Sequence, residues 1–255
     1  MLLTLARHDP IVTLTLNDPS RRNALTGELK DELLYAVERL SSDRLVRVVI
    51  LTGAGENFCA GGDLRSMDGL SPLEALARTD LNARLVNAIC EAPQVFIAAV
   101  EGWTAGGGLS LASLCDIIVA SRTARFVAGF SAVGLIPDLG CLWTLPRRIG
   151  TGRTALMVHT GAPIDADRAH AWGLVDELAD AGAALATALA VAGRIAEKAP
   201  AATVAIRRLM TAAHASFGDL VAAEAGMQAE LMTTADAAEG RRAFFEKRKP
   251  EFTRG

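Results

Sequence analysis

Two glycine-rich turns in this sequence have the composition of a site that holds a developing negative charge. The first lies in VILTGAGENFCAGGDLRSM (49–67) and the second in FIAAVEGWTAGGGLSLASL (96–114). Each turn joins an apolar run to a helix start, where the backbone can approach a ligand and present unpaired N–H groups. Neither turn contains GxxxxGK[ST] or GxGxxG, so neither is a nucleotide-phosphate loop. Two such turns facing each other predict an oxyanion hole, in which two N–H groups hold one oxygen.

A single carboxylate, Asp138, stands in the otherwise apolar segment AVGLIPDLG (132–140). A carboxylate in an apolar pocket has a raised pKa, which suits a group that takes up and returns a proton. The alternative is that Asp138 caps the helix predicted for LGCLWTLPRRIG (139–150), and its Pro-Asp setting suits that role. These residues by themselves leave both interpretations open.

Composition and charge exclude several classes of function. The 255 residues are 51% hydrophobic, which is enough apolar material for a large core. Lys and Arg number 26 against 29 Asp and Glu, so no basic excess supports nucleic-acid binding. The four cysteines have neither CxxC spacing nor a histidine at metal-ligand spacing, so we expect reduced thiols and no metal site. Without a signal-peptide pattern or a run of about 18 apolar residues, we expect a cytoplasmic protein with no membrane span.

Short apolar runs alternate with helical patterns through the first half of the chain. The runs rich in β-branched residues predict strands over 11–17, 46–53, 95–102 and 116–121. Helices are predicted over 26–43, where Thr26 is the N-cap, over 71–93, where Ser71 and Pro72 begin the helix, and over 106–116. This alternation is typical of an α/β architecture with a mainly parallel sheet.

The second half of the chain is predominantly helical from about residue 139. Residues 165–178 predict a helix, a stop at Gly173 and a short strand. Residues 181–246 are Ala-rich, and Pro200 is expected to separate two helices there. We predict a core over 1–195 and a helical region over 196–255, which either assembles the protein or covers the core.

Motifs spread over nearly the whole chain resemble the enoyl-CoA hydratase/isomerase family, also called the crotonase family. They are DPSRRNAL (18–25), FCAGGDL (58–64), VEGWTAGGGLSLASLCDIIVAS (100–121), GLIPDLG (134–140), TGAPIDADRAHAWGLVDEL (160–178) and FFEKRKPEF (244–252). The resemblance implies an α/β spiral of ββα units with C-terminal helices that assemble homotrimers, often paired into homohexamers. It also implies an acyl-CoA thioester substrate, with coenzyme A present only as part of that substrate and no separate cofactor.

The resemblance also assigns roles to residues. Gly62 and Gly107 would supply the two N–H groups that hold the thioester oxygen as it gains enolate charge. The residues that would contact the coenzyme are Arg22, Ala24, Ala60, Gly61, Gly62, Asp63, Leu64, Phe244 and Lys247. Asp63 and Asp116 are not expected to act as catalytic acids, because their side chains suit the cap of a helix or a turn.

Hydratases of this family use two glutamates, and the corresponding positions fall on Ser110 and Phe130. A serine hydroxyl of normal pKa cannot replace a tuned general base, and phenylalanine has no proton to give. Asp138 falls where dienoyl-CoA isomerases, oxepin-forming isomerases of phenylacetate degradation and 4-chlorobenzoyl-CoA dehalogenase carry a reactive acid. The resemblance therefore favours an enoyl-CoA isomerase in which Asp138 is the acid and base.

Two other functions stay open at this stage. The chain could be an atypical hydratase or lyase that uses Asp138 or Glu101, or it could bind acyl-CoA without transforming it. The helical stretch 64–90, which the resemblance places beside the acyl group, is rich in Leu and Ala and suits a lipid-like or aromatic acyl chain.

Overall fold

Six strands form the central sheet of the computed structural model, which describes residues 1–212 and 214–253. In spatial order they are β1 (Leu3–His8), β2 (Ile11–Leu16), β3 (Val48–Gly53), β4 (Val95–Val100), β6 (Ile117–Ser121) and β9 (Glu177–Ala179). The β1–β2 pair is antiparallel and the remaining pairs are parallel. A second sheet contains β5 (Trp103–Ala105), β7 (Arg125–Val127) and β8 (Ile164–Asp165). The predicted strands are therefore confirmed, and the parallel sheet is as expected.

The sequence prediction lacked β1, which is an edge strand. Only Leu3 of its six residues is buried, and the last four are exposed. Its sequence LTLARH therefore gives little of the periodicity from which a strand is recognised. The strand forms because it pairs with β2 along its whole length, from Leu3 opposite Leu16 to His8 opposite Ile11.

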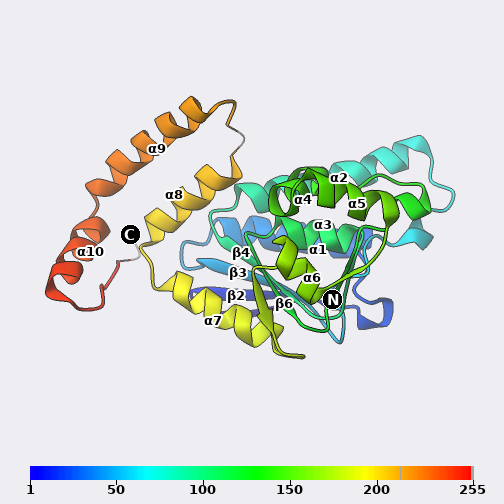
Figure 1. The fold of residues 1–255 in the computed structure, drawn as a ribbon, viewed down its shortest axis with the longest axis horizontal. Coiled ribbons are helices and arrows are strands. Elements are labelled where there is room, and N and C mark those ends of the chain that lie inside the picture. The colour runs from blue at the N-terminus through cyan, green and yellow to red at the C-terminus, as the bar shows by residue number, and fades with distance from the viewer. Residues whose placement is uncertain (213, 254–255) are drawn as a thin grey trace.

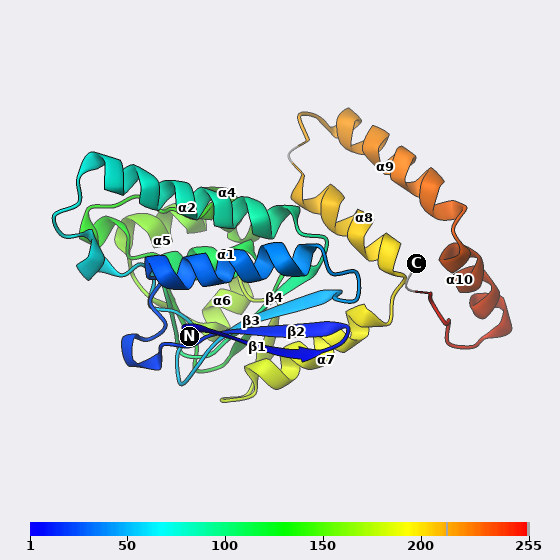
Figure 2. The same ribbon diagram turned by 180° about the vertical axis from the view of Figure 1, so that it is seen from behind.

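Ten helices are found among the described residues, and most of them cover the sheet (Figures 1 and 2). They are α1 (Gly27–Ser41), α2 (Pro72–Glu91), α3 (Gly107–Leu114), α4 (Cys141–Ile149), α5 (Thr151–Thr160), α6 (Ala166–Trp172), α7 (Ala184–Ala196), α8 (Pro200–Thr211), α9 (Phe217–Met232) and α10 (Ala235–Glu246). The predicted caps are present, since Thr26 accepts from the Leu29 N–H and Ser71 forms a capping box with Glu74. None of the helices in this part of the chain is both long and apolar enough to cross a membrane.

The central strands are buried on both faces, which explains their continuous apolar runs. On one face α1 packs against side chains that include Val49, Leu51 and Phe96. On the other face α7 packs against Val48, Ile50 and Ile97. Phe58, Cys59 and Leu109, from the two glycine-rich segments, belong to the large core on the α1 side of the sheet. Arg78 of α2 donates to the Asp63 carbonyl, so the first turn lies beside α2.

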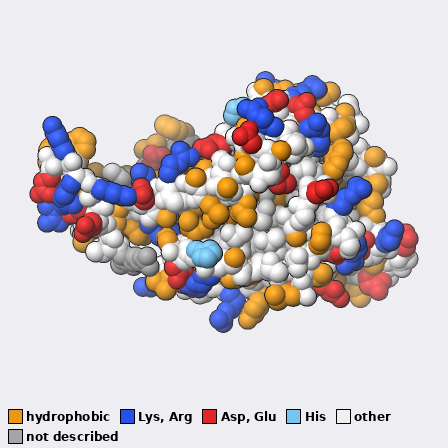
Figure 3. Space-filling view, turned by 90° about the horizontal axis from the view of Figure 1, so that it is seen from below, with side chains coloured by type: hydrophobic (Ala, Val, Ile, Leu, Met, Phe, Trp, Pro, Cys, Tyr) orange, Lys and Arg blue, Asp and Glu red, His pale blue; other side chains and the backbone are white. Residues whose placement is uncertain are grey.

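Helices α8, α9 and α10 form an arm that extends away from the sheet (Figures 1 and 2). The sequence analysis named only the helix break at Pro200 within 181–246, whereas four helices are present there. The break at Pro200 is confirmed, but Ser216 and Thr234 begin two further helices by accepting N–H groups of Asp219 and Ala237. Figure 3 shows the arm as a projection carrying charged and apolar side chains together. Helix α9 has no buried residue in this single chain.

Arg207 attaches the arm to the body. Its side chain is 3% exposed and donates to the Asp116 carboxylate at 2.7 Å. It also donates to the carbonyl oxygens of Ile89, Cys90 and Ala92, where α2 ends. The second carboxylate contact of Asp116 is the Phe96 N–H at the start of β4, at 2.7 Å. The prediction that Asp116 caps a helix or a turn was therefore wrong, because its carboxylate links β4 to Arg207 of the arm.

Arg207→Ala is expected to destabilise the protein by about 3 kcal/mol, because Asp116 and the helix-end carbonyls lose their buried partner. Chemical denaturation measures this loss. Arg208→Ala is the matched control, since Arg208 follows directly in α8 and is exposed. Equal stability of the two variants would contradict the role given to Arg207.

Candidate active site

The two glycine-rich turns lie side by side, held by backbone hydrogen bonds. The Cys59 N–H donates to the Trp103 carbonyl at 3.1 Å, and the Ala105 N–H donates to the Cys59 carbonyl at 2.9 Å. A Cβ atom placed on Gly107 would lie 3.6 Å from the Gly62 nitrogen. The predicted oxyanion residues are therefore neighbours, although they lie 45 positions apart in the sequence (107 minus 62).

The N–H groups of Gly62 and Gly107 have no acceptor within the described ranges 1–212 and 214–253. Gly107 is the first residue of α3, and first-turn N–H groups have no partner inside their own helix. The positive end of the helix dipole at this position also favours an anion. The arrangement can hold a carbonyl oxygen that becomes negatively charged.

Glycine is required in these turns because the two backbones approach closely. Gly61 has φ +94°, and a Cβ atom there would lie 2.6 Å from the Ala105 carbonyl oxygen. A Cβ atom on Gly108 would lie 2.4 Å from the Cys59 carbonyl oxygen. Any larger residue at either position would separate the turns and their N–H groups.

Asn23 fixes the first turn, and the sequence analysis missed it as an individual residue. Its side-chain amide donates to the carbonyl oxygens of Ala54 at 2.9 Å and Asn57 at 2.8 Å. Its side-chain oxygen accepts from the Asp18 N–H at 2.9 Å. The residue is fully buried with φ 57°. Its presence in the DPSRRNAL motif was the available signal, but the carbonyl groups that it holds in the first turn are more than 30 residues away.

Asp138 is not a helix cap. Helix α4 begins at Cys141 with Gly140 as the preceding residue, and no side chain caps it. Leu139 and Gly140 both have positive φ, and Asp138 meets the helix only through its backbone carbonyl, which accepts the Cys141 N–H at 3.1 Å. Its carboxylate Oδ2 accepts instead from the Asn82 amide at 2.9 Å. This contact overturns the capping interpretation.

Asp138 lies in the wall of a cavity of about 310 Å³ beside α2. The lining residues are Thr79, Asn82, Ala83, Val86, Asn87, Asp138, Leu139 and Gly140. The cavity is open, so Asp138 is exposed in it, but the surrounding protein still removes water from the carboxylate. This partial burial raises the pKa of Asp138, whereas the charges of Lys30 and Arg78 oppose the rise. Asp138 is the one carboxylate in this lining.

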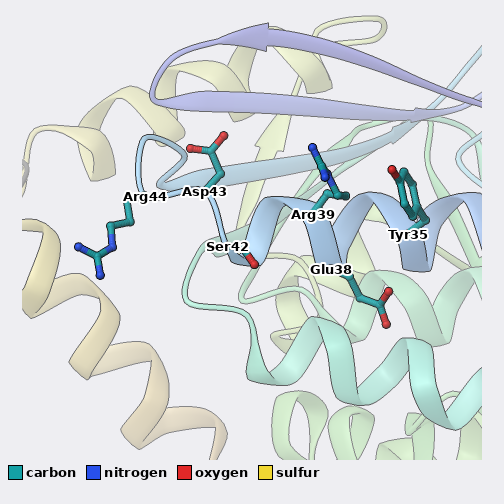
Figure 4. Close-up of a pocket in the computed structure, with 6 residues that line it drawn as sticks. All are labelled: Tyr35, Glu38, Arg39, Ser42, Asp43 and Arg44. Atoms are coloured by element: carbon teal, nitrogen blue, oxygen red, sulfur yellow. The ribbon is translucent and has the colours of Figure 1, made fainter.

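A larger hollow of about 640 Å³ lies at the end of α1 (Figure 4). Its lining consists of Tyr35, Glu38, Arg39, Ser42, Asp43 and Arg44. These side chains are mostly charged and include none of the predicted site residues. The smaller cavity therefore agrees better with the chemistry expected of an acyl group.

Lys30 lies beneath the cavity and was missed in the sequence analysis. It is 2% exposed, and its ammonium donates to the Asn82 Oδ1 at 2.7 Å. Burial lowers the pKa of Lys30 to about 8, and the nearby charge of Arg78 acts in the same direction. The signal in the sequence was its helical spacing with Leu33, Leu34 and Val37, because this spacing places a lysine on the apolar face of α1.

Ser110, Phe130 and Glu101 do not offer a free acid in this cavity. Ser110 is fully buried and its hydroxyl donates to the Gly106 carbonyl, whereas Phe130 is 6% exposed in the core. Glu101 accepts the N–H groups of Gly182 and Ala184 at the start of α7. Glu101 therefore holds the start of α7 against the loop that follows β4.

The predicted coenzyme contacts fall in two places. Arg22 and Ala60 are joined by a backbone hydrogen bond at 2.9 Å, and Leu25 bridges to Gly62, so Ala24 also lies beside the first turn. The members that adjoin this turn are Arg22, Ala24, Ala60, Gly61, Gly62, Asp63 and Leu64. Asp63 accepts from the Arg65 N–H as the predicted cap. Phe244 and Lys247 lie on the arm, away from this turn (Figure 1).

Comparison with known proteins agrees with this geometry. The family model for enoyl-CoA hydratase/isomerase matches residues 6–255. The 1,2-epoxyphenylacetyl-CoA isomerase of Escherichia coli is 35% identical over 95% of both chains. A probable enoyl-CoA hydratase of Rhodobacter capsulatus is also 35% identical, over 95% of this chain and 94% of its own.

The fold agrees with solved structures as well. A putative enoyl-CoA hydratase from Streptomyces coelicolor is 34% identical and superposes with a TM-score of 0.96, over 100% of this chain and 95% of its own. An enoyl-CoA hydratase from Bacillus anthracis has a TM-score of 0.95 at 29% identity over 100% of both chains. The expected crotonase-like α/β fold is confirmed, and the chain belongs to the enoyl-CoA hydratase/isomerase family.

Proposed function

We propose that this family member is an enoyl-CoA isomerase. The observation that carries the proposal is the position of Asp138, the one carboxylate in the lining of the cavity. The name of the isomerase relative supports it, and so does the absence of carboxylates at Ser110 and Phe130. Many relatives are named hydratases, which makes hydration the reaction to test against isomerisation.

The proposed reaction needs one base. Asp138 takes the proton from the α carbon of a 3-enoyl thioester, and the electron pair of that C–H bond spreads into a dienolate. The N–H groups of Gly62 and Gly107 hold the thioester oxygen, which carries the developing charge. Asp138 then returns the proton to the γ carbon, and the double bond comes to lie between the α and β carbons. Hydration would require a positioned water molecule in addition.

The raised pKa of Asp138 fits both halves of this reaction. A carboxylate of ordinary pKa is a weak base, and partial burial makes it a stronger one. The same burial stabilises the protonated Asp138 that forms in the first step, so the carboxyl group keeps the proton until it passes to the γ carbon. The neighbouring charges of Lys30 and Arg78 oppose the rise and favour the ionised form that the first step needs.

Product analysis of the wild-type protein tests the proposal. With 3-enoyl-CoA we expect the absorbance of a conjugated 2-enoyl-CoA to appear and the mass of the thioester to stay unchanged. With 2-enoyl-CoA we expect no product heavier by one water. Formation of 3-hydroxyacyl-CoA would instead establish a hydratase. Calorimetric binding with no turnover of either substrate, across aliphatic and aromatic acyl groups, would indicate a non-catalytic acyl-CoA-binding protein.

We also propose that residues 1–195 bind acyl-CoA and residues 196–255 assemble a homotrimer, which can pair into a hexamer. The arm exposes apolar side chains, namely Ile206, Met210, Phe217, Val221, Met232, Phe244 and Phe245. Such a surface favours burial against another copy. Phe244 and Lys247 lie on the arm, away from the first glycine turn of their own chain. In the proposed trimer they would therefore contact the coenzyme bound to a neighbouring copy.

A further inference from the structure

We infer that Lys30 and Asn82 form a relay that holds the Oδ2 carboxylate oxygen of Asp138, so that Oδ1 is the oxygen that exchanges a proton with the substrate. The inference rests on the proposed role of Asp138 and assigns two positioning residues to it. The relay runs from α1 through α2 to the loop before α4. Its contacts are Lys30 Nζ to Asn82 Oδ1 at 2.7 Å and Asn82 Nδ2 to Asp138 Oδ2 at 2.9 Å.

The chemistry of lysine fixes the direction of the relay. An ammonium group has donors only, so the atom of Asn82 that faces Lys30 must be the oxygen. The amide N–H of Asn82 must then face Asp138, where it needs an acceptor. An ionised carboxylate is the better acceptor, and a hydrogen bond to the ionised form favours that form. Lys30 therefore fixes the orientation of the Asn82 amide, and through that amide it acts on Asp138 without contacting it.

Packing does not explain a lysine at this position. Lys30 is 2% exposed and lies on the face of α1 that otherwise carries Leu29, Leu33 and Leu34. A buried ammonium loses its hydration, and an apolar side chain of similar length avoids that loss. Asn82, 8% exposed, is its hydrogen-bond partner among the described residues. The unfavourable burial of the Lys30 ammonium is understandable if its charge acts on Asp138 through Asn82.

Charges from several elements act on the two ends of the relay. Asp138 is influenced by Lys30 from α1 and by Arg78 from α2, and both lower its pKa against the effect of burial. Lys30 is influenced by Arg78, by Asp138 and by Asp31 of its own helix. Loss of Lys30 or of the Asn82 amide therefore removes a contribution that lowers the pKa of Asp138, and that pKa rises. Arg78 remains and limits the rise.

The pH dependence of turnover separates positioning from simple packing. Asp138 must be ionised to take a proton, so kcat/KM falls as the pH drops through its pKa. In Lys30→Met and in Asn82→Ala we expect this acidic limb to move upward by about one pH unit. We expect kcat for 3-enoyl-CoA to fall about tenfold, with a smaller change in KM. The control is Asn87→Ala, because Asn87 lines the same cavity from α2 and makes no hydrogen bond to Asp138. Asn87→Ala can change KM, but its kcat/KM should fall at the same acidic pH as that of the wild type.

The isosteric variant Asn82→Asp tests the same point by charge. It keeps the size of the side chain and the contact to Lys30, but it places a second carboxylate against Asp138. The relay predicts an upward shift at least as large as that of Asn82→Ala, because like charges disfavour ionisation. A purely structural role for Asn82 predicts that the isosteric variant is the milder of the two, and that result would overturn the relay.

A titration without substrate keeps this inference separate from the proposed reaction. In protein labelled with carboxyl-¹³C aspartate, the Asp138 signal is identified by its loss in Asp138→Asn. Its apparent pKa should be higher in Lys30→Met and Asn82→Ala than in wild type and Asn87→Ala. An unchanged pKa in both relay variants would overturn the inference. If Asp138→Asn kept its turnover, the proposed reaction would fail while this titration still measured the relay.

Discussion

Asp138→Asn is expected to lower kcat for the isomerisation of 3-enoyl-CoA by about 10²- to 10⁴-fold, the range for loss of a general base. The amide cannot accept the α proton at any accessible pH. Its oxygen can still accept from Asn82, so the loop before α4 should keep its place. Binding of a saturated acyl-CoA, measured by calorimetry, should therefore remain close to wild type. Activity that survived this change would show that another group takes the proton.

Glu101→Gln is the informative control, because Glu101 is the alternative to Asp138 as the reactive acid of an atypical hydratase or lyase. Its carboxylate holds the Gly182 and Ala184 N–H groups at the start of α7. The amide oxygen of glutamine can accept one of these bonds, so we expect modest destabilisation and turnover similar to wild type. A loss comparable to that of Asp138→Asn would instead support a reaction through Glu101.

Local patterns in the sequence predicted the elements whose signals are continuous. The buried central strands and the capped helices α1 and α2 appear where the apolar runs and the cap residues place them. The edge strand β1 was missed because four of its six residues are exposed. The arm was divided too coarsely because Ser216 and Thr234 begin helices within an Ala-rich stretch that has no proline at those points.

The sequence suggested only part of the candidate site, and the residues that it left out have a common feature. Gly62, Gly107 and Asp138 were predicted as site residues because each belongs to a recognisable local motif, and their roles stay predictions. Lys30 and Asn82 were not, because their contacts connect residues 52 and 56 positions apart. The interpretation of Asp138 as a cap failed for a local reason. The positive φ values of Leu139 and Gly140 turn the chain before α4 begins, and residue types alone do not reveal them.

Gly107→Pro is expected to lower kcat by about 10²- to 10³-fold, the effect of removing one oxyanion donor. Proline has no N–H, and it is tolerated at the first position of a helix, which Gly107 occupies in α3. Gly106 precedes it and has no Cβ atom to clash with the proline ring. The variant therefore removes the donor while the helix retains its start, which circular dichroism can verify.

Gly107→Ala distinguishes the loss of the N–H from the effect of added bulk. Alanine keeps the donor, and its Cβ atom would meet the ends of two flexible side chains, at 3.2 Å from Leu25 Cδ1 and 3.4 Å from Leu139 Cδ1. These side chains can move by a few tenths of an ångström, so the expected loss of kcat is much smaller than in the proline variant. Since the dienolate oxygen carries more charge than the ground-state carbonyl, removal of the donor should affect kcat more than KM. Equal losses in the two variants would mean that space around Gly107, and not its N–H, limits the reaction.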